Sequence, residues 1–285
     1  RLPGQDHDDR NFVLCLTSPG GNLAEGLKIG EIIRANWMAT YVPQRASCLS
    51  ACAVAFMHGR VAFWEYWMNL RVIHPTAVLG FHAPRLDLPP MDGAVPAPMV
   101  DAAYASAIST IAALAKAASG SVNDSRVPLI PLSLLEAMLS TPPDGFVYVD
   151  TLHKAFLWDI EIHPAGLVYP ADFDPQVAEY DLCLNADYET RTQSGGRRGW
   201  PTLTRDEVDL FRSSVFPPPA DLPAGYSFVT VSDLNTIGCG ILFDSETGFL
   251  VVRQYLDASF ETQVSLPAVY LFSPQTRIRD LWPAP

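Results

Sequence analysis

The sequence predicts an α/β domain, followed by a smaller β-rich region. Strand and helix patterns alternate along residues 12–57, and two further strand-like runs follow before residue 82. Such alternation is typical of parallel sheets built from βαβ units. After residue 225, short apolar runs are separated by turn residues, which predicts the β-rich region.

Composition limits the classes of function. The chain has 285 residues, of which 48% are hydrophobic and 18% charged, so it can bury a substantial core. The formal charge of −12 argues against nucleic acid or an anionic membrane surface as the main partner, because both favour clustered Lys and Arg. No apolar run reaches the roughly 18 residues of a membrane helix, and the first residues are not a signal peptide, so we expect a soluble chain.

The first ten residues are polar, and an apolar strand follows them. The cluster Asp6–Asp9 could bind a metal, but we favour an acidic chain end, and the sequence predicts no metal site and no cofactor. The strand begins at Phe12 and ends in the turn Ser18–Gly21. Backbone without side chains at a strand end can present N–H groups to an anion, as an oxyanion hole requires.

Residues 22–39 carry apolar side chains at three- and four-residue steps, which predicts an amphipathic helix with one buried face. Asn22 is a suitable N-cap for this helix, and Glu25 follows three positions later. The next four residues, Thr40–Pro43, form a short apolar pattern that predicts a buried strand.

Small residues surround Ser50, and the apolar run Ala51–Met57 follows it. We therefore expect Ser50 at the start of a helix, where the dipole and the unpaired N–H groups stabilise negative charge. Cys48 and Cys52 would then lie one helical turn apart around Ser50. A disulfide there would tighten the turn, but two buried thiols are the interpretation that we favour.

The other cysteines and an aromatic run are less informative. Five cysteines leave at least one unpaired, and Cys183 could pair with Cys239 in an oxidising compartment. The aromatic run Phe63–Met68 could line a substrate groove, although a packed helix or turn is the simpler interpretation.

A histidine follows the next strand pattern, in the segment Gly80-Phe81-His82-Ala83-Pro84. A serine, a histidine and a Gly-Gly oxyanion turn are parts that acyl-transfer chemistry requires together. His58 and His74 are rival bases, but neither lies in such a segment, so we prefer His82.

At these residues the chain resembles the Clp protease proteolytic subunit and its relatives in the ClpP/crotonase superfamily. Ser18–Gly21 resembles that family's oxyanion turn, the Ser50 segment its nucleophile helix, and residues 80–84 its histidine-proline motif, in the same order. The Cys-x-Ser-Ala-Cys form of the segment is closer still to periplasmic ClpP-like proteins of bacteria. The resemblance covers roughly residues 11–162 and implies a spiral of βαβ units, serine hydrolase activity and a periplasmic or secreted location. The family's usual first strand and helix have no counterpart here.

The same resemblance suggests a third catalytic residue. The family places an aspartate just before an x-Phe step, followed by a short helix and a last strand, and Asp144 matches that position. Asp150 and Asp101 are fallbacks, and taken alone Asp144 is almost as well explained as a turn residue. A proline-rich loop at residues 84–98 precedes a predicted helix, Met99–Ser119, whose equivalent in the family makes oligomer contacts, which implies a possible homo-oligomer.

The resemblance stops after Pro164, so we expect a catalytic domain over residues 1–164 and a β-rich region over 165–285. That region could bind a partner or cover the edge of the catalytic domain. Its predicted features are a turn at 192–198, a short helix opened by the capping box Thr204–Glu207, a linker at 217–223, strands at Tyr226–Val231, Gly240–Phe243, Phe249–Tyr255 and Val269–Phe272, and a hairpin turn at Ser245–Gly248.

The sequence thus predicts a serine hydrolase, specifically a ClpP-like endopeptidase acting on a peptide or protein. Ser50 would attack, His82 would transfer the proton, Asp144 would orient His82, and the N–H groups of Gly21 and Ala51 would hold the oxyanion. The alternative is a catalytically silent ClpP-like scaffold that binds through its C-terminal region. Crotonase-type chemistry on an acyl-CoA is disfavoured, because no Lys or Arg cluster near the site offers a place for the phosphates.

Overall fold

The structure of the chain is a computed structural model. Contacts between its residues divide the protein into two units. One unit comprises the described residues up to Asp150 together with Lys154–His163, and the other comprises Thr151–His153 and the described residues after His163. The predicted boundary after residue 164 lies next to this division. The structure describes residues 12–63, 66–84, 95–119, 128–142, 144–163, 167–168, 174, 177–180, 182–183, 218–232, 236–244, 249–256, 259–272 and 275–283.

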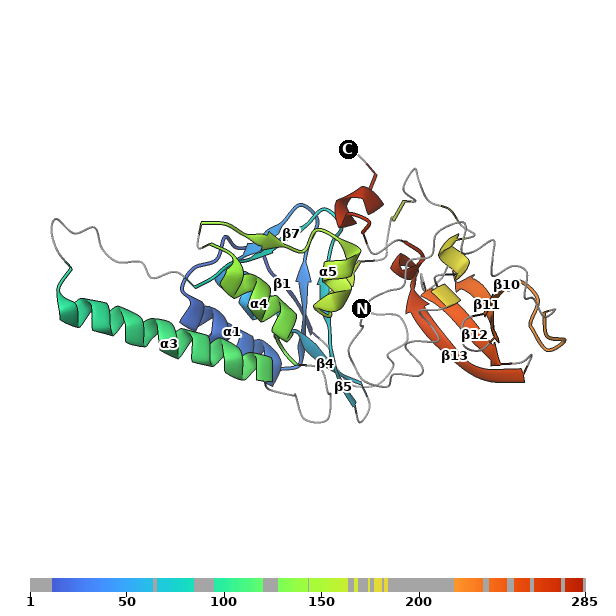
Figure 1. The fold of residues 1–285 in the computed structure, drawn as a ribbon, viewed down its shortest axis with the longest axis horizontal. Coiled ribbons are helices and arrows are strands. Elements are labelled where there is room, and N and C mark those ends of the chain that lie inside the picture. Colours follow the sequence, from blue (N-terminus) through green and yellow to red (C-terminus); the bar gives the residue numbers. More distant parts are fainter. Residues whose placement is uncertain are drawn as a thin grey trace. The chain divides into compact units, whose positions relative to one another are not determined.

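The first unit contains a parallel sheet in the order β1-β2-β6-β9, of which Figure 1 labels β1. Its strands are β1 (Phe12–Cys15), β2 (Met38–Val42), β6 (Arg71–Ile73) and β9 (Glu161–Ile162). Helix α1 (Leu23–Ala35) connects β1 to β2, so this part is a βαβ unit, as the alternation of patterns predicts.

Helix α1 begins where the sequence predicts and ends earlier. The side chain of Asn22 accepts a hydrogen bond from the backbone N–H of Glu25 at 3.2 Å, which confirms the predicted N-cap. The helix ends at Ala35, because Trp37 has a left-handed φ of 53° and the chain enters β2 at Met38. The apolar pattern continues across this turn, which is why it extended the prediction to residue 39.

A second sheet has the order β3-β7-β8 and carries the predicted site. Its strands are β3 (Ser47–Leu49), β7 (Val78–Phe81) and β8 (Val147–Tyr148), with β3 parallel to β7 and β8 antiparallel to it. Helix α2 (Ala51–Phe56) follows β3 after a single residue, Ser50, and every residue of α2 is buried. The predicted helix after Ser50 is therefore present, whereas strand β3 was not predicted, because the sequence placed the preceding strand at Thr40–Pro43.

The aromatic run forms the strands of a hairpin and not a packed helix, which was one of the two structures expected. Strand β4 (Arg60–Phe63) pairs antiparallel with β5 (Tyr66–Asn69), and the two residues between them lie outside the described residues. Aromatic residues are common in strands, and two short apolar runs around a turn satisfy this pattern as well as a helix does.

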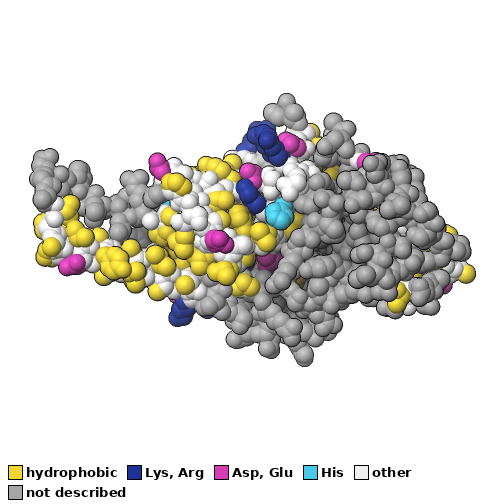
Figure 2. All heavy atoms as spheres, in the orientation of Figure 1, with side chains coloured by type: hydrophobic (Ala, Val, Ile, Leu, Met, Phe, Trp, Pro, Cys, Tyr) yellow, Lys and Arg dark blue, Asp and Glu magenta, His cyan; other side chains and the backbone are white. Residues whose placement is uncertain are grey.

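Three further helices belong wholly or partly to this unit: α3 (Ala97–Ser119), α4 (Leu132–Ser140) and α5 (Leu152–Leu157). The sequence predicted α3, and α5 with β9 matches the predicted short helix and last strand, whereas α4 was not predicted. Four large apolar side chains of α3 are exposed, namely Val100, Tyr104, Ile108 and Ile111. Figure 2 shows hydrophobic side chains gathered along this helix. By length and composition, α3 is the one described helix that could cross a membrane, which corrects the expectation that no apolar run is long enough.

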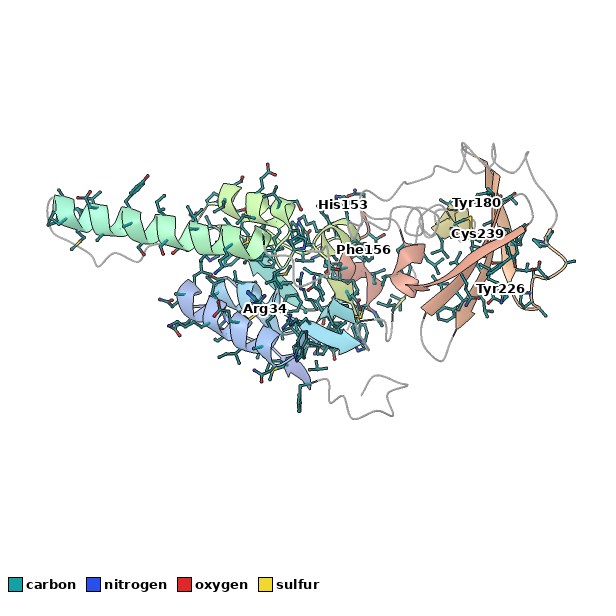
Figure 3. All side chains as sticks on the ribbon, turned by 90° about the horizontal axis from the view of Figure 1, so that it is seen from below. Arg34, His153, Phe156, Tyr180, Tyr226 and Cys239 are labelled. Atoms are coloured by element: carbon teal, nitrogen blue, oxygen red, sulfur yellow. A yellow bond between two sulfur atoms is a disulfide. The ribbon has the colours of Figure 1, made fainter. Side chains whose placement is uncertain are left out.

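The second unit contains an antiparallel sheet in the order β10-β11-β12-β13. Its strands are β10 (Ser227–Ser232), β11 (Thr236–Asp244), β12 (Phe249–Leu256) and β13 (Ser259–Pro267), so a β-rich C-terminal region is present. A disulfide joins Cys183 to Cys239 on β11, and Figure 3 shows Cys239 with the nearby Tyr180, both buried.

One strand prediction in this unit is wrong. Residues Ala268–Leu271 form a 3-10 helix, η1, and the last strand is β13, which ends at Pro267. A short apolar run does not distinguish a strand from a tight helical turn, and proline commonly ends a strand. A second 3-10 helix, η2 (Ile278–Leu281), follows. Several predicted features lie outside the described residues: Asp6–Asp9, most of the loop at 84–98, the turn at 192–198, the capping box Thr204–Glu207 and the turn Ser245–Gly248.

Candidate active site

Ser50 occupies a sharp turn between β3 and α2. Its φ is 57° and its ψ is −125°, a conformation that non-glycine residues adopt only under strain. Two backbone bonds hold the turn: the N–H of Leu49 donates to Ser18 O at 3.0 Å, and the N–H of Ser50 donates to Gly80 O at 2.9 Å. A strained serine between a strand and a helix is the arrangement of nucleophile elbows.

His82 directly follows β7 and reaches Ser50. Its Nε2 lies 2.7 Å from Ser50 Oγ, a hydrogen-bonding distance. The pairing of β3 with β7 explains the approach, because parallel neighbouring strands bring their carboxyl ends to the same edge. The structure thus brings the predicted nucleophile and the predicted base together.

The glycine turn lies against Ser50, as the predicted oxyanion role requires. Gly20 has a φ of 105°, and a Cβ on it would lie 2.6 Å from Ser50 Cβ, so no other residue fits without displacement. The hydroxyl of Ser18 accepts a hydrogen bond from the Gly20 N–H at 3.1 Å and shapes the turn. A Cβ on Gly21 would meet no atom within 4 Å, so space is open there.

Both predicted oxyanion donors are unoccupied. The N–H groups of Gly21 and of Ala51, Cys52 and Ala53 at the start of α2 donate to no acceptor within the described parts of the chain. The side chain of Ser50 does not cap the helix, so its oxygen stays available for attack. A helix N-terminus with free amide groups stabilises an adjacent negative charge.

Cys48 and Cys52 form a disulfide around Ser50, which corrects our expectation of two thiols. The turn at Ser50 reverses the chain, and the Cα atoms of the two cysteines come within 5.3 Å, inside the usual range for a disulfide. Both residues are buried, as expected. The bond links the last strand before the nucleophile to the first turn of α2.

The structure does not bring Asp144 to His82, which corrects the predicted triad. Asp144 is an exposed residue in a turn closed by a hydrogen bond from Gly145 N–H to Pro142 O at 2.9 Å. His82 Nδ1 is buried and has no hydrogen-bond partner among the described residues. The interpretation of Asp144 as a turn residue therefore fits this structure.

An aromatic side chain lies beside His82 in place of the aspartate. The ring of Phe146 packs edge-on against the imidazole, with centroids 4.9 Å apart and planes at 73°, and it stacks on Tyr148 at 5.7 Å. In the sequence, Phe146 served only to locate Asp144, and its contact with His82 was not predicted. The signal was present, because Phe146 immediately precedes β8, the strand that pairs with the strand before His82.

The fallback carboxylates do not orient His82 either. Asp150 accepts a hydrogen bond from Lys154 Nζ at 2.6 Å, and Asp101 is an exposed residue of α3. Among the described residues, no group of three or more His, Cys, Asp or Glu side chains could hold a metal ion.

The rival histidines have other surroundings. The Nδ1–H of His58 donates to Val54 O at 2.9 Å, and burial lowers the pKa of His58 to about 4. His74 Nδ1 accepts the N–H of Thr76 at 3.1 Å, and burial, together with nearby His163, lowers the pKa of His74. Neither histidine contacts the hydroxyl of Ser50, so the preference for His82 stands.

Comparisons with known proteins add nothing to this geometry. A scan against protein-family models finds no match, and a search of curated proteins finds no significant relative. A strained serine, a histidine at hydrogen-bonding distance and open amide groups around them can together perform acyl transfer.

Proposed function

We propose that the chain is a serine hydrolase that cleaves peptide bonds with a Ser50–His82 pair. The observation that carries this proposal is the 2.7 Å contact between His82 Nε2 and Ser50 Oγ, at a serine held with a positive φ. Strain of this kind is typical of functional sites, where the surrounding structure holds a residue in a costly conformation.

In this proposal Ser50 Oγ attacks the carbonyl carbon of the peptide while its proton passes to His82 Nε2. The oxyanion of the tetrahedral intermediate is held by the N–H groups of Gly21 and Ala51. His82 then gives the proton to the leaving amine, and an acyl ester remains on Ser50. Water, deprotonated by His82, hydrolyses the ester and restores both residues.

We also propose that the two sheets of the first unit form a ClpP-like spiral and that the protein works in the periplasm or outside the cell. The order of the three motifs supports the first point. The disulfides Cys48–Cys52 and Cys183–Cys239 support the second, because such bonds persist in oxidising compartments.

We further propose that the protein forms a homo-oligomer through α3. Helix α3 exposes a row of apolar residues that another copy of the chain could cover. Analytical ultracentrifugation tests this point with Ile108→Asp, which should lower the oligomeric state, and with Ser109→Asp on an adjacent exposed position as the control. An unchanged state in Ile108→Asp would contradict self-association through α3.

A second candidate is a catalytically silent scaffold of the same fold. One observation favours it: His82 Nδ1 is buried without an acceptor among the described residues, so nothing there fixes the tautomer that a base needs. Hydrolases that use a serine and a histidine normally supply a third group at this atom.

Labelling with a fluorophosphonate probe distinguishes the two candidates, because it reports an activated serine without a known substrate. We expect the probe on Ser50, located by peptide mass mapping, and no label in Ser50→Ala or His82→Ala. Ser140→Ala, at an exposed position of α4, is the matched control and should label normally. Folded protein that does not label would contradict the hydrolase and leave the scaffold.

A further inference from the structure

Arg71, at the start of β6, is a buried arginine for which the described residues provide no hydrogen-bond acceptor. Its side chain is 0% exposed, and its Nε, Nη1 and Nη2 atoms are all buried with no partner. A guanidinium carries five N–H donors, and a buried charge normally has its donors satisfied. Because the described residues leave these donors unsatisfied, we expect a bound group to accept hydrogen bonds from Arg71.

The nearest carboxylate does not fill this role. Asp159 Oδ2 lies 3.9 Å from Arg71 Nη1, beyond hydrogen-bonding distance, and it accepts a hydrogen bond from Asn69 Nδ2 at 2.9 Å. Asp159 is also partly exposed, so water weakens its field. Burial lowers the pKa of Arg71 to about 10 despite Asp159, which means that the carboxylate does not compensate the desolvation of the guanidinium.

Acceptors on the neighbouring segments are already in use. Arg71 is opposite Thr40 on β2. Three backbone carbonyl groups bonded to Thr40 or to Leu70, the residue before Arg71, already accept hydrogen bonds. Leu70 O accepts from Thr40 N–H, Gly59 O from Leu70 N–H, and Phe56 O from the Thr40 hydroxyl. The turn that carries Asp159 adds a further buried donor without an acceptor, Trp158 Nε1. This part of the first unit therefore has an excess of buried donors.

We propose that Arg71 anchors a binding site for a small monovalent anion, such as a halide or the carboxylate of formate or acetate. The planar fork of a guanidinium matches such anions and can donate two parallel hydrogen bonds to an oxyanion. Asn69 and Asp159 are both partly exposed, which gives the site a side open toward solvent. We expect a small ligand because the guanidinium is itself fully buried.

Diffraction from crystals of the full chain grown in sodium bromide tests this site directly. We expect an anomalous bromine peak within hydrogen-bonding distance of the Arg71 guanidinium. Density for water alone at the guanidinium, or no density at all, would overturn the proposal. This measurement uses the wild-type chain and does not depend on a variant that folds.

Thermal unfolding gives the matching test in solution. Acetate should stabilise the protein relative to the bulkier gluconate at equal ionic strength, and acetate at roughly ten times its Kd should raise the folded-to-unfolded ratio about tenfold. Arg71→Met should abolish this difference, since replacing a buried charge by an apolar side chain of similar size is often tolerated. Arg71→Lys, which keeps the charge and loses the fork, serves if Arg71→Met does not fold.

Arg60 provides the matched control, because its guanidinium already has partners. Its Nε donates to the backbone oxygen of Arg34, labelled in Figure 3, at 2.7 Å, and the guanidinium lies 3.5 Å from the centre of the Trp37 ring. Arg60→Met should respond to acetate as the wild type does. An equal response to acetate in the wild type and in the Arg71 variant would overturn the proposal.

Discussion

The two ends of helix α2 are built in opposite ways. At its N-terminal end, the N–H groups of Ala51, Cys52 and Ala53 have no acceptor in the described residues. At its C-terminal end, the last four carbonyl groups all accept hydrogen bonds: Ala53 O from Met57 N–H, Val54 O from the His58 ring, Ala55 O from His58 N–H, and Phe56 O from Gly59 N–H and the Thr40 hydroxyl.

This difference indicates which end of α2 has a functional role in addition to a structural one. Every helix begins and ends with groups that lack partners within the helix, and a structural end satisfies them with neighbouring atoms. The open end of α2 follows a strained serine and faces a glycine turn, whereas the closed end packs against a buried histidine. Groups left open beside a strained residue are available to a substrate, and saturated groups hold the helix in place.

Two glycines pack against these two ends, and replacing each one tests the comparison. A Cβ on Gly20 would lie 2.6 Å from Ser50 Cβ, and a Cβ on Gly30 would lie 2.4 Å from the ring of His58. We expect Gly20→Ala to reduce the rate of fluorophosphonate labelling on the order of a thousandfold, because it displaces the nucleophile and the adjacent oxyanion amide.

Gly30→Ala should act on stability and not on chemistry. Forcing a methyl group against the buried ring of His58 is expected to lower the free energy of unfolding by about 3 kcal/mol. The folded fraction should still label at the wild-type rate, measured after correction by circular dichroism. Equal losses of labelling in folded Gly20→Ala and folded Gly30→Ala would show that the two ends do not differ as we argue.

Acidification should lower the stability of the protein through His58, at the C-terminal end of α2. The pKa of His58 is about 4 in the folded protein, below its ordinary value of 6.5, so the unfolded chain binds more protons between these pH values. Stability from His58 is therefore complete above pH 6.5 and is lost as the pH falls toward 4, by about 3 kcal/mol. Urea unfolding at several pH values measures this slope.

His58→Gln removes the titrating group while it keeps an N–H donor near Val54 O. The variant should be less stable than the wild type at pH 7, and its stability should change less between pH 6.5 and 4. A slope identical to that of the wild type would assign the acid sensitivity to other groups, of which buried His74 is one.

The disulfide at the open end is expected to have a smaller effect. Cys48 and Cys52 are four residues apart, so their bond closes a short loop and restricts the unfolded chain by about 2 kcal/mol. Urea unfolding of the double variant Cys48→Ala/Cys52→Ala should show this loss. A loss of 4 kcal/mol or more would mean that the bond also holds the turn at Ser50, which a fall in labelling would reveal.

Local patterns predicted much of the fold and part of the site. The N-cap at Asn22 and the helix after Ser50 follow from short-range rules of capping and periodicity. The pairing of Ser50 with His82 was predicted from the order of their motifs, and the parallel pairing of β3 with β7 explains their contact. Such rules work when the atoms concerned lie at the ends of regular elements.

The remaining features depend on tertiary contacts that no local pattern contains. Arg71 has the sequence context of an ordinary strand residue, and only the packing of the sheet shows that it is fully buried. The position of Asp144 was inferred from spacing to Phe146, but a turn of the chain decides which of the two side chains lies beside His82. Loop conformation, unlike periodicity, is not fixed by residue type.

The smallest expected effect concerns Asp144. Because Asp144 is exposed and His82 Nδ1 has no partner among the described residues, Asp144→Asn should change the labelling rate of Ser50 by less than about threefold.

Phe146→Leu, at the residue that does contact the imidazole, should slow labelling more, because the smaller contact allows the ring to turn away from Ser50. Stopped-time labelling at one pH compares the two variants, with Asp150→Asn as a control for the loss of a nearby charge. A loss of a thousandfold or more in Asp144→Asn alone would restore the predicted triad, because a removed orienting carboxylate reduces serine hydrolase activity by about that much or more.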